Sequence, residues 1–439
     1  MARKMKNSGI EWIGEIPLEW ELKRLKALFL ERKEKNDPVQ TDFILSLGAA
    51  YGVVPYSEKE GGGNKAKEDL SDYRLAYPND IVMNSMNIIS GSVGISKYFG
   101  CVSPVYYMLY PRSNNISPNF FCYMFQTKAF QRSLLGLGNG ILIKESSNGN
   151  FNTVRMRIPM EKLGIHLLPL PTLDEQEKIA SFLDQKCAEI DAVIEKTKET
   201  IEEYKKLKQS IITEAVTKGI RGNRPMKDSG IEWIGEIPVE WIKNSIKSVA
   251  TTCSGGTPSS GDTSLYDGDI NWICSYDLKE KPITESGRKI TQKGADTIAG
   301  KMQSIGSILI AMYGGSGTIG NSGILKCEAR TNQAICSVKF NNDFVLDFYG
   351  FYYILAIRKH WMIYAVGTRK DPNISQDIIK RMPCVIPPIN EQQEIIDYLN
   401  QKCAEIDILI AKKTNLLTEL ENYKKSLIYE YVTGKKEVK

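Results

Sequence analysis

The sequence predicts an α+β protein that combines two similar α/β domains with two long helices in a pseudo-two-fold arrangement. Two pairs of repeated segments indicate this. SGIEWIGEIP occurs at 8–17 and again at 229–238, and QKCAEID occurs at 185–191 and again at 401–407. The segments between these repeats differ in sequence. Near-identical ends around dissimilar middles predict two copies of one scaffold with different surfaces, which suits a partner that presents two sites.

Length and composition describe an ordinary globular protein. The 439 residues suffice for two to four domains, and the repeat favours two units of about 220 residues. A net charge of +5 permits a nucleic-acid partner without requiring one. No apolar segment approaches the about 18 residues of a membrane span, and no signal-peptide core follows MARKMKNSG, so we expect a cytoplasmic protein.

The cysteines and histidines indicate neither a disulfide framework nor a metal site. Nine cysteines lie far apart without a C-x-x-C motif, which predicts reduced thiols. Cys187 and Cys403 lie in the repeated segments, where we expect small core residues. The only two histidines, His166 and His360, leave little for metal or acid-base chemistry.

Residues 1–170 form the first predicted domain, with strands at 80–83 and 106–110 and a helix near 120–135. Lysine can neutralise phosphates, and amide or hydroxyl groups near turns can read base edges. By themselves such residues are more typical of a solvated surface. The candidates for DNA contact in this domain are Ser46, Tyr51, Asn84, Ser85, Asn87 and Lys144.

Residues 171–223 form the first predicted helical region. No glycine or proline occurs from 174 to 217, and Asp174 with Glu177 resembles a capping box after Pro171. A heptad pattern over this length predicts a helix of some 60 Å that packs lengthwise. The apolar seam, a candidate helix-helix and partner interface, consists of Leu183, Ile190, Ile194, Ile201, Tyr204 and Ile211.

Residues 224–386 form the second predicted domain, with strands at 307–312 and 334–338 and a helix near 344–364. SGSVGIS at 90–96 aligns with SGTIGNS at 316–322, which indicates that the two domains share a fold. Two polar clusters at predicted element ends supply the DNA-contact candidates of this domain: Arg330, Thr331, Asn332, Gln333, Thr368, Arg369 and Lys370.

Gly315, Gly317 and Gly320 formally match the G-x-G-x-x-G pattern of a dinucleotide site. That site requires a following helix, whereas NSGILKCEA is typical of a turn and a strand, so we favour a hairpin. The chain contains neither a G-x-x-x-x-G-K-[ST] motif nor the [D/N]-P-P-[F/Y/W] motif of adenine-N6 methyltransferases. We therefore predict no catalytic residues and no metal site.

Residues 387–439 form the second predicted helical region, in which Asn390 and Gln393 again resemble a capping box after two prolines. Its seam consists of Leu399, Ile406, Ile410, Leu417, Leu420 and Leu427. Further apolar residues widen the stripe beyond a two-helix seam and suggest a third and fourth helix: Phe182, Val193, Ile212, Ile396 and Leu416. The long helices could pair with each other, pair with a partner's helices, or merely cover their own domains.

These residues carry a resemblance to the specificity subunits of Type I restriction-modification enzymes. The resemblance rests on the paired SGIEWIGEIP openings, on the helix starts LPLPTLDEQEKIASFLDQK (167–185) and CVIPPINEQQEIIDYLNQK (384–402), and on SGGTPS (254–259) and TNQ (331–333). It spans essentially the whole chain, and the repeated helix start is its most specific part.

The resemblance implies two target recognition domains separated by two helical regions that form an antiparallel coiled coil in a quasi-circular chain. In the family each recognition domain reads one half of a bipartite sequence in double-stranded DNA, and the helices fix the spacing. Two methyltransferase subunits bind the conserved regions, and restriction subunits with motor activity complete the complex. The implied cofactors, S-adenosylmethionine, ATP and Mg²⁺, belong to those partners and not to this chain.

Two readings from other classes stay open at this point. One is a self-contained methyltransferase or nuclease, against which the missing motifs argue. The other is a coiled-coil scaffold or decoy protein that binds proteins without sequence-specific DNA readout. Binding to DNA across a salt series separates the second reading from a DNA-reading subunit.

Overall fold

The computed structural model describes residues 3–49, 51–59, 65–141, 144–145, 151–152, 155–314, 317–367 and 372–438. The chain forms two compact units. Unit 1 comprises Met1–Lys198 with Asn415–Lys439, and unit 2 comprises Glu199–Thr414. Each unit combines one variable segment with parts of the two long helices, α5 (Leu173–Lys218) and α11 (Ile389–Val432). The domain boundaries drawn from the sequence stay predictions.

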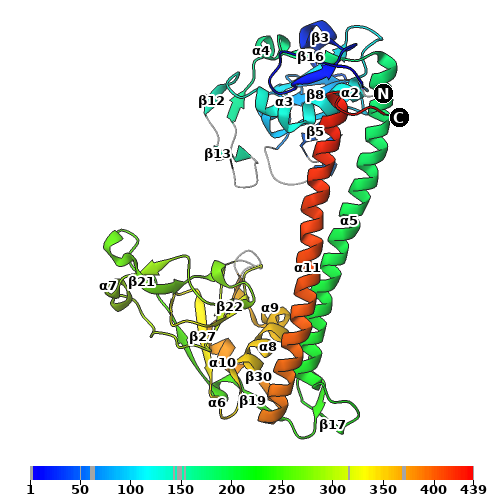
Figure 1. Cartoon of the computed structure of the whole chain (residues 1–439). Coiled ribbons are helices and arrows are strands. Elements are labelled where there is room, and N and C mark those ends of the chain that lie inside the picture. The colour runs from blue at the N-terminus through cyan, green and yellow to red at the C-terminus, as the bar shows by residue number, and fades with distance from the viewer. Residues whose placement is uncertain are drawn as a thin grey trace. The chain divides into compact units, whose positions relative to one another are not determined.

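Unit 1 contains short strands and helices beside its parts of α5 and α11 (Figure 1). Its largest sheet is antiparallel and has the order β4-β11-β8-β9. The elements before α5 are β1 (Met5–Asn7), β2 (Glu15–Pro17), β3 (Glu21–Arg24), α1 (Leu25–Leu28), β4 (Phe29–Arg32), β5 (Leu45–Gly48), β6 (Gly52–Pro55), η1 (Tyr56–Glu58), β7 (Arg74–Ala76), β8 (Ile81–Asn84), η2 (Ile88–Ser90), β9 (Val93–Ile95), β10 (Gly100–Val102), β11 (Tyr106–Pro111), α2 (Pro118–Gln126), α3 (Lys128–Ser133), β12 (Asn139–Ile141), β13 (Lys144–Glu145), β14 (Phe151–Asn152), β15 (Arg155–Arg157), α4 (Met160–Gly164) and β16 (Leu167–Leu170).

Unit 2 has a similar arrangement, with one more strand in its main sheet. Its largest sheet has the order β20-β27-β24-β25-β22, in which β22 runs parallel to β25. The elements between α5 and α11 are β17 (Met226–Asp228), β18 (Glu236–Pro238), β19 (Ile242–Ser245), α6 (Ile246–Val249), β20 (Ala250–Ser254), η3 (Thr263–Leu265), β21 (Tyr266–Ile273), η4 (Ser275–Asp277), β22 (Lys281–Ile283), β23 (Lys289–Ile290), α7 (Gln292–Asp296), β24 (Ile308–Ala311), β25 (Ser322–Leu325), β26 (Arg330–Thr331), β27 (Ile335–Phe340), α8 (Asp347–Ile357), η5 (Arg358–His360), α9 (Trp361–Tyr364), β28 (Val366–Gly367), β29 (Pro372–Asn373), α10 (Gln376–Arg381) and β30 (Pro383–Ile386).

The side chains of the central strand β8 alternate between two cores in unit 1. Ile81 and Met83 pack with the aromatic side chains of α2 and α3, whereas Val82 packs in a separate cluster with Leu45 and Met108. This period of two is what an extended strand requires when both of its faces are covered. The strands and helices predicted from apolar runs in both domains are present, although the helix expected near 120–135 is interrupted at Thr127, whose side chain caps α3.

The four strands of the main sheet in unit 1 correspond to four of the five strands in the main sheet of unit 2. Tyr106 pairs with Asn84 in unit 1, and Ile335 pairs with Ala311 at the same place in unit 2. The strand pairs β4-β11 and β20-β27 also correspond in register. The prediction that the domains share a fold is therefore confirmed.

The alignment of SGSVGIS with SGTIGNS is wrong by three residues. Gly94 pairs with Val82, and its counterpart is Gly323, which pairs with Leu309. Two residues of the shift arise because ten residues connect β24 to β25, whereas eight connect β8 to β9. The third arises because equivalent residues of β8 and β24 lie 227 positions apart, whereas the alignment uses 226. The hairpin interpretation is nevertheless confirmed, since antiparallel β25 and no helix follows Gly320 in the described part of this segment.

The long helices run antiparallel within each unit. In unit 1, Lys424 lies 2.6 Å from Asp191, and the rings of Phe182 and Tyr431 pack at a tilt of 39° with centroids 4.6 Å apart. In unit 2, Lys208 lies 2.7 Å from Asp407. The two ion pairs are repeat-equivalent, because each residue of one lies 216 positions from its counterpart in the other. The antiparallel pairing implied by the resemblance is therefore present.

Apolar side chains pack between the two long helices of each pair. Three of the additional apolar residues, Phe182, Ile212 and Ile396, pack into the core of their own unit, whereas Val193 and Leu416 remain exposed. Part of the wide apolar stripe on the long helices is thus used for packing against the chain's own domains. Seven of the predicted seam residues are buried, namely Leu183, Ile190, Ile194, Ile201, Leu399, Ile406 and Leu427, and Tyr204, Ile211, Ile410, Leu417 and Leu420 are half-buried.

A buried glutamine anchors the start of each long helix. In unit 1 the Gln176 side chain accepts a hydrogen bond from the Ser117 backbone N–H and donates to the carbonyls of Asn115 and Pro171. In unit 2 Gln392 makes the three equivalent bonds. The capping boxes predicted at Asp174 and Asn390 are wrong, because the helices begin one residue earlier and place these residues inside the first turn.

Next to each glutamine, a glutamate joins the helix start to the repeated opening segment. Glu391 accepts a hydrogen bond from the Trp241 indole (3.1 Å) and lies 2.6 Å from Arg224. The equivalent cluster in unit 1 consists of Glu175, Trp20 and Arg3. The E-Q pair of the repeated motif thus stabilises the junction between helix and domain.

Each repeated opening segment also packs on the far end of a long helix. Tyr429 donates to the Trp12 carbonyl and Lys435 to the Ile13 carbonyl, so the two ends of the chain lie side by side in unit 1 (Figure 1). In unit 2, Lys218 at the end of α5 donates to the Ile234 carbonyl (2.9 Å). These contacts produce the expected quasi-circular course of the chain.

All nine cysteines are free thiols. Cys187 and Cys403 are buried in the helix pairs, as predicted, and burial raises the pKa of Cys122, Cys336 and Cys384 to about 12. Across the described residues, no group of three or more histidine, cysteine or acidic side chains is placed to hold a metal ion. None of the described helices has the length and apolar character needed to cross a membrane.

Candidate nucleic-acid interface

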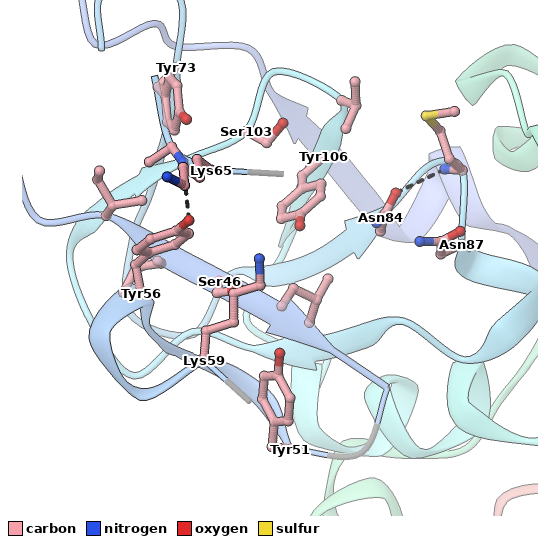
Figure 2. A pocket seen from close by; sticks show the side chains of 16 residues that line it. Ser46, Tyr51, Tyr56, Lys59, Lys65, Tyr73, Asn84, Asn87, Ser103 and Tyr106 are labelled. Carbon is pink, nitrogen blue, oxygen red and sulfur yellow. Dashed lines mark hydrogen bonds between the residues drawn. The ribbon is translucent and has the colours of Figure 1, made fainter. Parts of the chain in front are cut away.

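Unit 1 contains a cavity of about 460 Å³ that is lined by aromatic and polar side chains (Figure 2). Four of the predicted DNA-contact residues lie on it: Ser46, Tyr51, Asn84 and Asn87. The other lining residues are Ile44, Leu45, Leu47, Tyr56, Lys59, Lys65, Ala66, Tyr73, Ser103, Met86, Val105 and Tyr106.

Three strands and one turn position the polar walls of the cavity. Ser46 lies on β5, Asn84 ends β8, and Tyr106 begins β11 directly opposite Asn84. Tyr51 occupies the turn between β5 and β6, where its ring covers Gly48 so closely that a Cβ at Gly48 would collide with it. The strand ends therefore present these side chains together, although they are far apart in sequence.

Hydrogen bonding fixes some of these groups and leaves others available. The hydroxyls of Tyr56 and Tyr73 accept backbone N–H bonds from Ala66 (3.1 Å) and Lys67 (3.2 Å). Asn84 Oδ1 accepts from the Met86 N–H (3.0 Å), which leaves Asn84 Nδ2 as a donor toward the cavity.

Two side chains of the cavity are nearly buried yet have polar atoms without a partner among the described residues. Asn84 is 9% exposed and Ser46 is 7% exposed, and neither Asn84 Nδ2 nor Ser46 Oγ has a hydrogen-bond partner in the described part of the chain. Both residues line the cavity, so a ligand or solvent in it can bond to these atoms. Burial, with Tyr51 and Tyr73 nearby, also raises the pKa of Tyr106, so its hydroxyl remains a neutral donor.

Unit 2 shows that the fold does not require these polar residues. The positions of Asn84 and Tyr106 correspond to Ala311 and Ile335, which pair in the same register and are fully buried. The same sheet is thus built with an apolar pair in unit 2. The polar pair in unit 1 is a property of that unit's surface.

Basic side chains line the cavity and a neighbouring groove. Lys59 and Lys65 line it, and the Lys59 ammonium lies 5.3 Å from the centre of the Tyr56 ring. A second, larger groove of unit 1, about 950 Å³, shares Tyr51 with the cavity. Its lining includes the basic residues Lys97, Lys128, Lys198, Lys424 and Lys425 and the acidic residues Asp184, Asp191 and Glu421.

The remaining candidates of unit 1 are placed differently. Ser85 is fully buried and donates to the Val105 carbonyl (2.6 Å), so it holds the backbone beside the cavity. The side chain of Lys144 lies outside the described part of the structure.

Two motifs of unit 2 lie against each other. The Gly256 N–H of the SGGTPS loop donates to the Thr331 carbonyl of the TNQ segment (2.9 Å), and a Cβ at Gly255 would collide with Thr331. Thr257 donates to Gln333, and both side chains are exposed. Segments about 75 residues apart in sequence thus form one polar surface.

The other candidates of unit 2 are less accessible. Asn332 is half-buried and its Oδ1 accepts from the Ala334 N–H. Thr331 is buried, and Arg330 donates to the carbonyls of Ala295, Ile298 and Gly300 around the end of α7. The predicted residues Thr368, Arg369 and Lys370 lie outside the described residues.

We expect Arg330→Ala to lower the free energy of unfolding of unit 2 by about 2 kcal/mol, because three carbonyls lose a charged donor. Gln333→Ala should change stability by no more than about 0.5 kcal/mol, since Gln333 is exposed. Chemical denaturation with hydrogen exchange in α7 measures both effects. Equal effects of the two substitutions would contradict the structural role of Arg330.

A family model described as "Type I restriction modification DNA specificity domain" matches this chain at residues 17–203 and 238–419. The chain belongs to this family. Each match covers one variable segment and part of a long helix, in keeping with the duplicated architecture. As a member of the Type I specificity family, the chain is a DNA specificity subunit and not a catalytic one.

Curated relatives in the Type I specificity family match most of this chain. A putative Type I restriction enzyme specificity subunit, MjaX, from *Methanocaldococcus jannaschii* is 22% identical over 97% of this chain and 96% of its own length. The EcoKI specificity subunit of *Escherichia coli* K12 is 21% identical over 84% of this chain and 77% of its own length.

Solved structures show the same fold. A chain from a study of complex assembly and conformational transition of the type I R-M system superposes with a TM-score of 0.70 at 13% identity, covering 95% of this chain and 98% of that one. The HsdS subunit from *Thermoanaerobacter tengcongensis* gives a TM-score of 0.51 at 14% identity with the same coverage. The predicted α+β fold of a Type I specificity subunit is therefore confirmed.

Sequence reasoning missed several residues of the two polar surfaces of this specificity subunit. Tyr56, Tyr73, Ser103 and Tyr106 of the cavity were not among the candidates, and neither was Thr257. Comparison of strand positions between the halves could have found Tyr106, because its counterpart is Ile335. The correct comparison needs the strand register, which the shifted motif alignment obscured.

Proposed function

We propose that this specificity subunit reads a bipartite DNA target, one half-site with each unit, within a Type I restriction-modification complex. The observation that carries the proposal is the pair of sheets that agree in register but differ in surface side chains, such as Asn84 and Tyr106 against Ala311 and Ile335. Two equivalent folds with different surfaces suit two different half-sites in double-stranded DNA.

In unit 1 the cavity supplies the reading groups. Amide and hydroxyl groups of Asn84, Asn87 and Ser46 can hydrogen-bond to base edges, and Lys59 and Lys65 can neutralise phosphates. In unit 2 the exposed side chains of Thr257 and Gln333 supply the corresponding polar surface.

The exposed apolar residues of the long helices favour one docking surface for a partner on each unit. In unit 1 they are Val193, Leu416 and Tyr423, and in unit 2 they include Leu207, Ile408 and Leu409. Val193 is repeat-equivalent to Leu409, and Leu207 to Tyr423. We propose that each surface holds one methyltransferase subunit and that restriction subunits join this assembly, because exposed apolar patches mark interaction sites.

In this scheme the cofactors belong to the partners. Each methyltransferase subunit would act with S-adenosylmethionine on an adenine turned out of the duplex, and ATP and Mg²⁺ would serve the restriction subunits. This chain would contribute the position on DNA and the choice of sequence.

The test measures DNA binding by the chain with its methyltransferase partner across a salt series. We expect a steep linear fall of log affinity with log salt, and Lys65→Ala should reduce the slope by about one while weakening binding to all sequences alike. Asn84→Ala should cost about 1–3 kcal/mol on the cognate duplex only.

The two units should affect different halves of the target. Asn84→Ala should relax discrimination in one half-site, and Gln333→Ala should relax it in the other. No DNA binding with the partner present would instead support a scaffold or decoy. Relaxation of the same half-site by both variants would contradict bipartite reading.

A further inference from the structure

The polar groups of the unit 1 cavity are recessed, unlike those of a surface that reads bases in a DNA groove. Direct readout of a duplex needs polar groups on an exposed element that enters a groove. Here Ser46 and Asn84 are nearly buried, and their unpartnered polar atoms lie on the wall of a partly open cavity (Figure 2). A ligand must enter the cavity to reach them.

The lining of the cavity fits a flat heteroaromatic ring. Tyrosines 51, 56, 73 and 106 surround it, and two of them have hydroxyls fixed by backbone N–H groups, so their rings are held in place. Asn84 Nδ2 and the hydroxyls of Ser46 and Ser103 offer hydrogen bonds to a polar ring edge. Pockets that hold one extruded base combine aromatic stacking with hydrogen bonds to the base edge in this way.

Size and charge agree with this ligand. The volume of about 460 Å³ lies within the range of pockets that enclose small planar ligands. Lys59 and Lys65 place positive charge beside the aromatic walls, as a nucleotide's phosphate requires.

The duplication supplies an internal control. Unit 2 builds the same strand pair with buried Ala311 and Ile335, so neither Asn84 nor Tyr106 is needed for the fold. Asn84 Nδ2 lines the cavity without a protein partner among the described residues, so this donor is available to a ligand. The polar pair therefore points to a ligand of unit 1 alone.

We propose that the cavity of unit 1 holds a single nucleobase, stacked between tyrosines and hydrogen-bonded by Asn84 and Ser46. The base would come from the DNA half-site, turned out of the duplex, or from a free nucleotide. The inference rests on the proposed DNA-reading function for the first source. It makes unit 1 the only one of the two units to take a base by this route.

The experiment uses the full chain with its methyltransferase subunits and duplexes that carry one mismatch at each position of the cognate site. Mispairing removes part of the cost of extruding a base. We expect one position, other than a methylated adenine, at which a mismatch tightens binding about tenfold. The double variant Asn84→Ala with Tyr106→Ile, which installs the residues of unit 2, should lose this gain. Gln393→Ala, at an exposed position of α11 that bonds to Asp397 on its own helix, should keep it.

A second arm measures binding of each nucleoside monophosphate by calorimetry. Saturable binding that the double variant abolishes, without any mismatch effect, would assign the pocket to a free nucleotide. Neither effect in a folded complex that still binds its cognate duplex would overturn the nucleobase pocket and leave the DNA-reading function intact. Melting curves of the variants establish that folding is preserved, and loss of all cognate binding by the unmodified complex would instead refute the proposed function.

Discussion

Replacing Gln392 by alanine is expected to destabilise unit 2 by about 3–5 kcal/mol. The Gln392 amide satisfies the Leu346 N–H and the carbonyls of Phe344 and Pro387 in a fully buried site. Its removal leaves these backbone groups without partners, and each unsatisfied buried group costs about 1–3 kcal/mol. Denaturant unfolding with hydrogen exchange at the start of α8 measures the loss.

The neighbouring glutamine provides a matched control. Gln393 is exposed and bonds only to Asp397 on its own helix, so Gln393→Ala should cost no more than about 0.5 kcal/mol. Gln176→Ala in unit 1, with Gln185→Ala as its control, should reproduce the difference. Similar costs for Gln392→Ala and Gln393→Ala would show that the buried amide does not hold the helix to the domain.

Replacing Arg224 by methionine should destabilise unit 2 by about 3–5 kcal/mol, because it leaves the Glu391 carboxylate buried without its cation. Glu391 is 1% exposed and would retain only the Trp241 indole as donor. The equivalent change Arg3→Met should cost less, since Glu175 is 21% exposed and water can solvate it.

A double substitution tests the cause of this loss. Glu391→Gln removes the charge but keeps an acceptor for the Trp241 indole, so Arg224→Met with Glu391→Gln should regain most of the lost stability. Equal instability of the single and double variants would mean that lost packing of the Arg224 side chain, and not the buried charge, is responsible. Thermal unfolding of the four proteins decides between these explanations.

Much of the fold could be predicted because its signals are local. The heptad pattern over 174–217, with no glycine or proline, predicted α5 to within a residue at each end, and apolar runs predicted β8, β11, β24 and β27. The repeats predicted two copies of one fold. The helix starts were placed one residue late, because Asp174 and Asn390 resemble caps in sequence. In α5 the Thr172 hydroxyl accepts from the Glu175 N–H (3.4 Å) instead. The buried glutamines satisfy backbone groups about 45–60 residues away, which the local sequence does not show.

The candidate site could be predicted only in part because it is assembled across long sequence separations. Asn84 and Ser46 were identified as polar residues near turns, but their burial depends on the pairing of β8 with β11. Arg330 looked more suitable than these two residues in sequence, yet its donors are used within unit 2 by carbonyls around the end of α7. The polar composition of a segment near a turn does not distinguish a side chain that faces a ligand from one that bonds to the carbonyls at a helix end.

The central claim is that this chain selects one bipartite DNA target. Single-molecule sequencing of N6-methyladenine in host DNA, with the gene intact and deleted, tests it most directly. We predict that deletion removes methylation from one bipartite motif and leaves all other methylated motifs unchanged. A methylome that stays the same after deletion, in cells that express the chain together with its methyltransferase partner, would contradict the claim.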